Sequence, residues 1–114
     1  SDWVSANHYN TNVVEFIRSP EAERWQPFLQ ALDATLAAWF APQLAAVRSA
    51  DPGRLVTVGW SDPLLAGLPA NAALDFICTN RYPLNSPRWL NYHLGIATAL
   101  QAAFPGKPVI LAEF

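Results

Sequence analysis

A single carboxylate stands at the end of the last apolar run of the chain, where it could serve as a nucleophile, an acid or a base. Residues 107–112 have the sequence KPVILA and lead directly to Glu113. An apolar run of this length after a Pro-Gly break predicts a strand buried on both faces, as in parallel sheets covered by helices. In α/β folds the carboxyl ends of the strands form the working face. The position of Glu113 therefore favours an enzyme.

Two earlier apolar runs also end in residues that could contact a ligand. The run at 54–60 ends in Trp60, and the run at 74–80 opens into Asn80, Arg81 and Tyr82. Asn80 and Arg81 could bind hydroxyl groups, although Arg81 could equally pair with an acid. An aromatic ring such as Trp60 can cover the apolar face of a sugar. We therefore expect a group of polar and aromatic side chains around Glu113.

The remaining candidates are weaker. Trp89 could also stack on a sugar, but Trp60 is the better candidate, and we favour helix-core or loop packing for Trp89. His8 and His93 have no neighbours at ligand spacing, so we expect no metal site. The five glycines are too far apart to form a phosphate-binding turn, which excludes Rossmann and P-loop sites and leaves no cofactor motif.

Helical and strand patterns alternate along the chain. After a first segment, 1–19, that is a loop or a strand remnant, the patterns predict a helix at 20–49 that Pro42 interrupts, with a kink or a restarted helix over Gln43 to Arg48. They then predict strands at 54–60, 74–80 and 108–113, separated by a short helix at 64–68 and a helix from Pro87. This alternation predicts an α/β fold with parallel strands joined by right-handed crossovers. The polar and aromatic strand ends suit the mouth of a barrel.

Apolar stripes on the two long helices predict which side chains face the sheet. On the first helix we expect Trp25 and Trp39 to lie in the core. The full stripes are Trp25, Phe28, Leu29, Leu32, Leu36, Trp39 and Phe40 on the first helix, and Leu90, Leu94, Ala97, Leu100 and Phe104 on the second.

Composition limits the classes of partner. With 52% hydrophobic and 14% charged residues the chain can bury a core, and a net charge of -2 without a basic stripe argues against nucleic acid. No apolar run reaches membrane-spanning length. The single cysteine, Cys78, lies in an apolar run and is expected to be a buried thiol. The cellular location stays open.

Three motifs in order resemble a known family. The stretches DPGRLVTVGW, LDFICTNRYP and GKPVILAEF are similar to the fifth, sixth and seventh strands of clan A retaining glycoside hydrolases, especially the family-5 cellulase and mannanase type. The resemblance covers about residues 25 to 114 and implies part of a (β/α)8 barrel. It also implies that Glu113 is the nucleophile and that Tyr82 hydrogen-bonds it. Asn80 departs from the family, which often has histidine at that position.

The second catalytic carboxyl group is missing from the sequence. A retaining glycosidase needs a general acid/base, which in this family is the glutamate of an Asn-Glu pair ending the fourth strand. The chain contains no Asn-Glu dipeptide. Either that strand lies upstream of Ser1, which we favour, or Val13–Ile17 is its remnant and Arg18, Ser19 and Pro20 stand in place of Asn-Glu-Pro.

We therefore expect the chain to be a segment of one barrel domain whose full-length parent is a retaining β-glycosidase, with the segment alone inactive. A whole barrel takes about 250 residues. Three barrel strands leave open sheet edges, through which copies could self-associate. Two other classes stay open: a non-catalytic carbohydrate-binding or pseudo-enzyme barrel, and a structural α/β module in which Glu113 has no chemical role.

Overall fold

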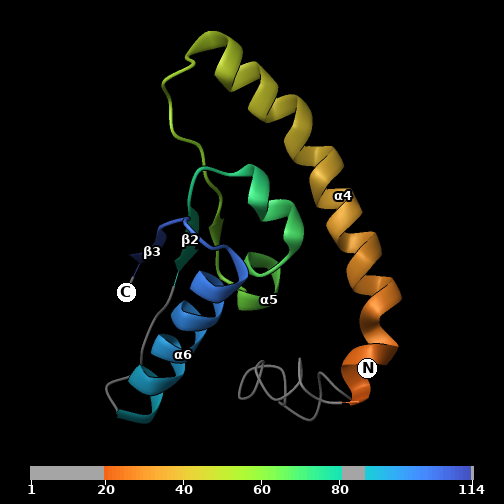
Figure 1. Ribbon diagram of the computed structural model, residues 1–114, viewed down its shortest axis with the longest axis vertical. Helices are drawn as coiled ribbons and strands as arrows, with labels where there is room; N and C mark the ends of the chain where they lie inside the picture. Colours follow the sequence, from red (N-terminus) through yellow and green to blue (C-terminus); the bar gives the residue numbers. More distant parts are fainter. Residues whose placement is uncertain (1–19, 81–86, 114) are drawn as a thin grey trace.

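The described part of the chain, residues 20–80 and 87–113 of the computed structural model, combines a parallel sheet with helices (Figure 1). In chain order its elements are α4 (Pro20–Ala50), β1 (Gly59–Trp60), α5 (Pro63–Ala66), the 3-10 helix η1 (Pro69–Ala73), β2 (Ile77–Asn80), α6 (Pro87–Ala103) and β3 (Val109–Glu113). The fold is α/β, as the alternating patterns predict. Residues 1–19, with the possible strand remnant, lie outside the described residues.

The three strands are parallel and follow the order β1-β2-β3. Their ladder is shorter than the expected strand runs, and β1 is limited to two residues. Side chains replace ladder bonds before β1: the Val56 amide donates to Asp75 Oδ2 at 2.7 Å, and Thr57 Oγ1 donates to the Phe76 carbonyl at 2.6 Å. The stretch ahead of β1 is therefore tied to the chain ahead of β2 by mixed side-chain and backbone bonds.

The helices pack on one face of the sheet. Ile77 of β2 is fully buried in a cluster with α5 and α6, and Val109 of β3 packs against the same cluster. A second cluster joins Leu74 to α4, and Trp60 packs against both clusters. This shared set of contacts defines the helix-covered face.

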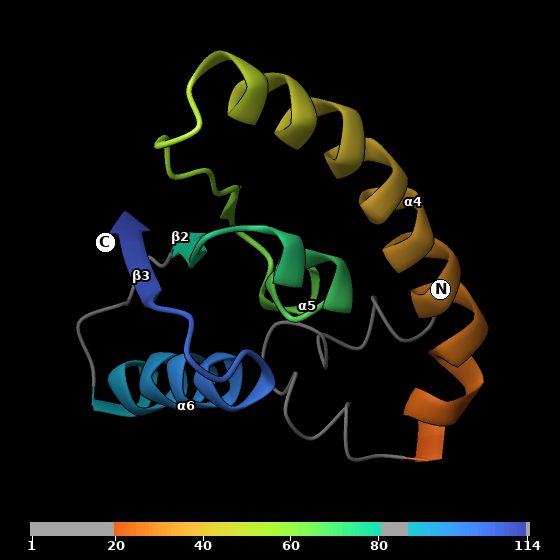
Figure 2. The ribbon, with the colours of Figure 1, turned by 45° about the horizontal axis from the view of Figure 1, so that its top comes forward.

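The other sheet face carries Gly59 and Cys78, which are register partners, and Ile110, which is the partner of Cys78. None of these three residues belongs to the helix-packed clusters, and Ile110 is 43% exposed. Cys78 is buried, as expected. In Figure 2, α6 lies beneath β3, and α4 arches along the other side of the described part. We call the side of the sheet that carries Gly59, Cys78 and Ile110 the open face, because none of the three belongs to the clusters packed against the described helices.

Helix α4 is one continuous element that includes Pro27 and Pro42. Of the two outcomes expected at Pro42, a restarted helix does not occur. Instead the helix curves along its length (Figure 2), as expected where a proline removes an amide donor and crowds the preceding turn.

The predicted apolar stripe of α4 is only partly buried. Phe40 and Leu44 reach the core, whereas Trp39 is 53% exposed and Trp25 stacks edge-to-face with the exposed Phe28. The expectation that Trp39 lies in the core is wrong, and Trp25 is only partly buried. The reason is that the described residues provide packing partners mainly for the side of α4 that carries Phe40 and Leu44.

The side of helix α6 that packs against the sheet is not the side that the sequence predicts. His93, Ile96 and Leu100 are buried, and Phe104 follows just beyond the helix. Leu90 and Leu94 are each 55% exposed, so their predicted place against the sheet is wrong. The spacing of the buried residues defines a helical stripe rotated from the predicted one, with Leu100 and Phe104 common to both. No helix within 20–80 and 87–113 is long and apolar enough to cross a membrane.

Candidate functional site

The carboxyl ends of the three strands meet at one edge of the sheet because the strands are parallel. Trp60 ends β1, Asn80 ends β2 and Glu113 ends β3. Asn80 and Glu113 are Cα partners across the ladder, and the register shifts between Thr79 and Asn80. Such a bulge re-aims side chains at a strand end and is common beside active sites. The fold therefore puts the predicted nucleophile and a predicted hydroxyl-binding residue on neighbouring strands.

Asn80 also lies against the end of β1. A Cβ atom built on Gly59 would lie 3.4 Å from Asn80 Oδ1 and 3.7 Å from Asn80 Nδ2. The carboxamide of Asn80 thus lies beside the Cα of Gly59, on the open face. Gly59 itself is exposed, and Asn80 is partly buried. One uncharged group that can both donate and accept hydrogen bonds is thereby placed at the strand ends.

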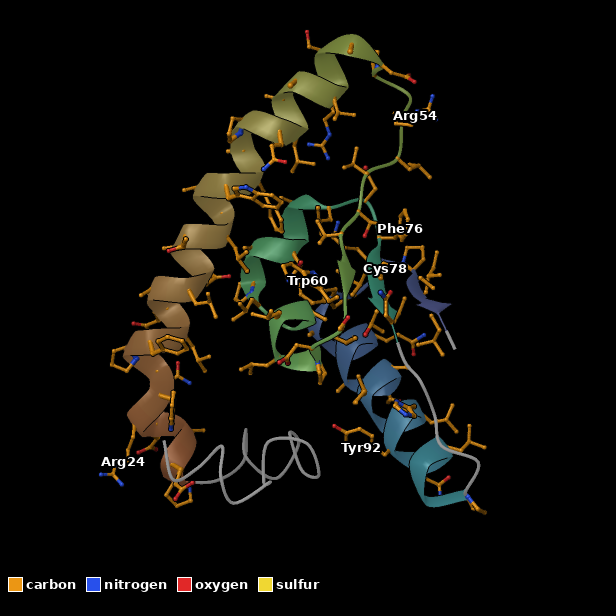
Figure 3. The ribbon with its side chains drawn as sticks, turned by 180° about the vertical axis from the view of Figure 1, so that it is seen from behind. Arg24, Arg54, Trp60, Phe76, Cys78 and Tyr92 are labelled. Carbon is orange, nitrogen blue, oxygen red and sulfur yellow. The ribbon has the colours of Figure 1, made fainter. Side chains whose placement is uncertain are left out.

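Trp60 takes a structural position on the helix-covered face. Its indole Nε1 donates to Asn71 Oδ1 at 2.8 Å, and its ring lies 6.5 Å from that of Phe40. Its backbone carbonyl accepts from Thr79 Oγ1 at 3.0 Å. Figure 3 shows Trp60 toward the short helices that follow β1, Cys78 on β2 and Phe76 just before that strand. The structure therefore does not bring Trp60 together with Asn80, and its stacking on a sugar stays a prediction.

Asn71 is the residue that the sequence patterns do not single out. It is fully buried, and its side-chain nitrogen donates to the carbonyls of Leu65 at 2.7 Å, Leu68 at 3.0 Å and Ala66 at 3.3 Å. Together with the Trp60 bond, these contacts join the end of β1 to α5 and η1. Buried amides are stable only when bonded in this way. A lone asparagine between alanines carries no sequence signal of such a network.

The remaining predicted site residues fall partly or wholly outside the described structure. Arg81 and Tyr82 lie outside the described residues. Trp89 lies in α6 and Glu113 in β3, but the structure describes only the backbone of each. The contact between Tyr82 and Glu113 therefore stays a prediction.

A groove on the described part of the chain lies away from these strand ends. It has a volume of about 260 Å³ and is lined by α4, α5 and the residues between α5 and η1, including Gln26, Asp33 and Leu64. Asp33 already accepts a hydrogen bond from the Ala70 amide at 2.6 Å. The groove is lined by none of the predicted site residues.

Within residues 20–80 and 87–113, no three histidine, cysteine, aspartate or glutamate side chains are grouped closely enough to hold a metal ion. No known family model, curated protein or solved structure matches the chain. The functional assignment therefore rests on the sequence motifs and on the geometry of the strand ends.

Proposed function

We propose that this segment belongs to a retaining glycoside hydrolase that cleaves β-glycosidic bonds in an oligosaccharide or polysaccharide. The observation that carries the proposal is the pairing of Asn80 with Glu113 at the carboxyl ends of adjacent parallel strands. A partial (β/α)8 barrel, comprising strands five to seven, is part of the same proposal. Helix packing on one sheet face supports it, because barrel strands turn their other face inward.

In the proposed reaction, the Glu113 carboxylate attacks the anomeric carbon while a second carboxylic acid, outside this segment, protonates the departing glycosidic oxygen. The resulting covalent ester is then hydrolysed: the second group takes a proton from water, the water oxygen attacks the anomeric carbon, and Glu113 leaves as a carboxylate. Carboxyl groups about 5 to 5.5 Å apart suit this double displacement.

Asn80 supports a substrate that carries hydroxyl groups, such as a sugar ring. It lies at the carboxyl ends of the strands, where its carboxamide can exchange hydrogen bonds with a hydroxyl group. The charged side chains of Arg48, Asp75 and Lys107 lie instead at the amino ends, where they bind backbone atoms or one another.

Covalent trapping tests the proposal. The protein carrying this segment with its natural flanking sequence is incubated with 2-deoxy-2-fluoro β-glucosides and β-mannosides that bear a good leaving group, and its peptides are analysed by mass spectrometry. We expect the added mass of one glycosyl group on the peptide that contains Glu113. A label on another acid, or hydrolysis with inversion, would contradict the proposal, and sugar binding without any hydrolysis would favour the carbohydrate-binding alternative.

A further inference from the structure

Gly59 has no conformational reason to be glycine. It lies in β1 without a positive φ angle, so any residue could adopt its backbone conformation. Glycine inside a strand weakens the strand and often marks a place where another group comes close to the backbone. Here the close group is the Asn80 carboxamide, whose oxygen lies 3.4 Å from the place of a Cβ atom.

We propose that Gly59 is a positioning residue: because it carries no branched side chain, it leaves the space in which the Asn80 carboxamide lies beside the end of β1, next to the register position of Glu113. This inference rests on the proposed function. A methyl group at position 59 would fit in ordinary contact with Asn80. A branched side chain extends further and would push the carboxamide away from the strand end.

The orientation of Asn80 matters for hydrogen bonding to substrate. Because Asn80 is the Cα partner of Glu113, its amide can bind a hydroxyl of the same sugar that Glu113 attacks. Binding energy gained next to the reacting carbon contributes to catalysis when the contact strengthens in the transition state. Gly59 would thus act on the substrate through Asn80.

The variant Gly59→Val distinguishes a positioning role of Gly59 from a purely structural role. Valine favours strands more than glycine does, so the variant should unfold at the same or a higher urea concentration. Its kcat/KM should nevertheless fall about tenfold, the loss expected for one neutral hydrogen bond. The fall in kcat/KM should be smaller in Gly59→Ala than in Gly59→Val. Gly95→Ala is the matched control, because Gly95 in α6 has no atoms within 4 Å of the added methyl group.

Asn80→Ala completes the test. If Gly59 acts through Asn80, the Gly59→Val/Asn80→Ala double variant should be no worse than Asn80→Ala alone. If the kcat/KM losses of the two single variants multiply in the double variant, valine blocks the ligand directly and the inference is overturned. An unchanged kcat/KM in Gly59→Val would also overturn it.

A second measurement does not depend on activity. In the wild-type protein, NMR should detect a contact between the Asn80 side-chain amide protons and the Gly59 α protons. In Gly59→Val, the corresponding contact between the Asn80 amide protons and the valine α proton should be absent. If the contact is absent in the wild type, the positioning inference fails while the proposed function stands. If the contact is present but Glu113 cannot be trapped, the proposed function fails and the substrate role of Asn80 fails with it.

Discussion

The two ends of the sheet use their polar side chains differently. At the amino ends, charged groups bind backbone atoms: Lys107 Nζ donates to the Leu74 carbonyl at 2.6 Å, and Arg48 Nη2 donates to the Ala73 carbonyl at 3.1 Å. Asp75 accepts from the Val56 amide and lies 3.7 Å from Arg48. This end is a network that joins α4 to the start of each strand.

At the carboxyl ends, Gly59 and Asn80 instead lie together on the open face, and Glu113 of β3 is the Cα partner of Asn80. The polar groups that stabilise this end, Asn71 and Thr79, are fully buried and bind the end of β1 on the helix-covered face. The comparison indicates that the stabilising groups and the proposed ligand-binding groups occupy separate places in the fold. Changes at the amino ends should alter stability, and changes at the open carboxyl ends should alter activity.

Asp75→Ala should give the largest change in stability. It removes the acceptor of the partly buried Val56 amide and the partner of Arg48. We expect the free energy of unfolding to fall by about 2 kcal/mol, as for a charged hydrogen bond, with kcat/KM per folded molecule unchanged. Urea denaturation followed by tryptophan fluorescence measures the effect.

Asp51→Ala is the control for this variant. Asp51 pairs with Arg54 at 3.0 Å, but both side chains are largely exposed. Its loss should cost less than about 0.5 kcal/mol. Equal losses in the two variants, or a large fall in activity in Asp75→Ala, would break the proposed division between the two sheet ends.

Asp62→Ala should have a smaller effect. The Asp62 side chain accepts from the Leu64 amide at 2.8 Å and caps α5, just after β1. Loss of such a cap costs about 1 kcal/mol, whereas Ser61→Ala, at a neighbouring exposed position, should change little. If Ser61→Ala lowers the free energy of unfolding as much as Asp62→Ala does, the turn and not the cap stabilises this part of the protein.

The sequence patterns predict the order and type of the elements other than η1, because these elements depend on local signals. Pro20 and Pro87 begin α4 and α6, and the apolar runs before Asn80 and Glu113 lead into β2 and β3. Alternation of these elements is enough to predict a parallel sheet. The carboxyl-end location of Asn80 and Glu113 follows from the same reasoning.

What the patterns miss depends on contacts between distant segments. The exposed sides of Trp39 and Leu94 are set by which neighbours the fold supplies, and a helical stripe alone does not reveal this. The Asn71 network likewise joins groups that are separated along the chain. The role of Gly59 emerges only when β1 and β2 lie side by side.

The most direct test of the central claim compares Glu113→Gln with the wild-type protein in hydrolysis of β-glucan and β-mannan. Glutamine keeps the shape of the side chain but cannot act as the carboxylate nucleophile. We predict that kcat/KM falls by at least about 10³-fold, in line with losses seen for other nucleophiles. The unfolding midpoint should stay unchanged, and Glu23→Gln, on the exposed first turn of α4, should keep full activity. Activity in Glu113→Gln within tenfold of the wild-type value would contradict the account.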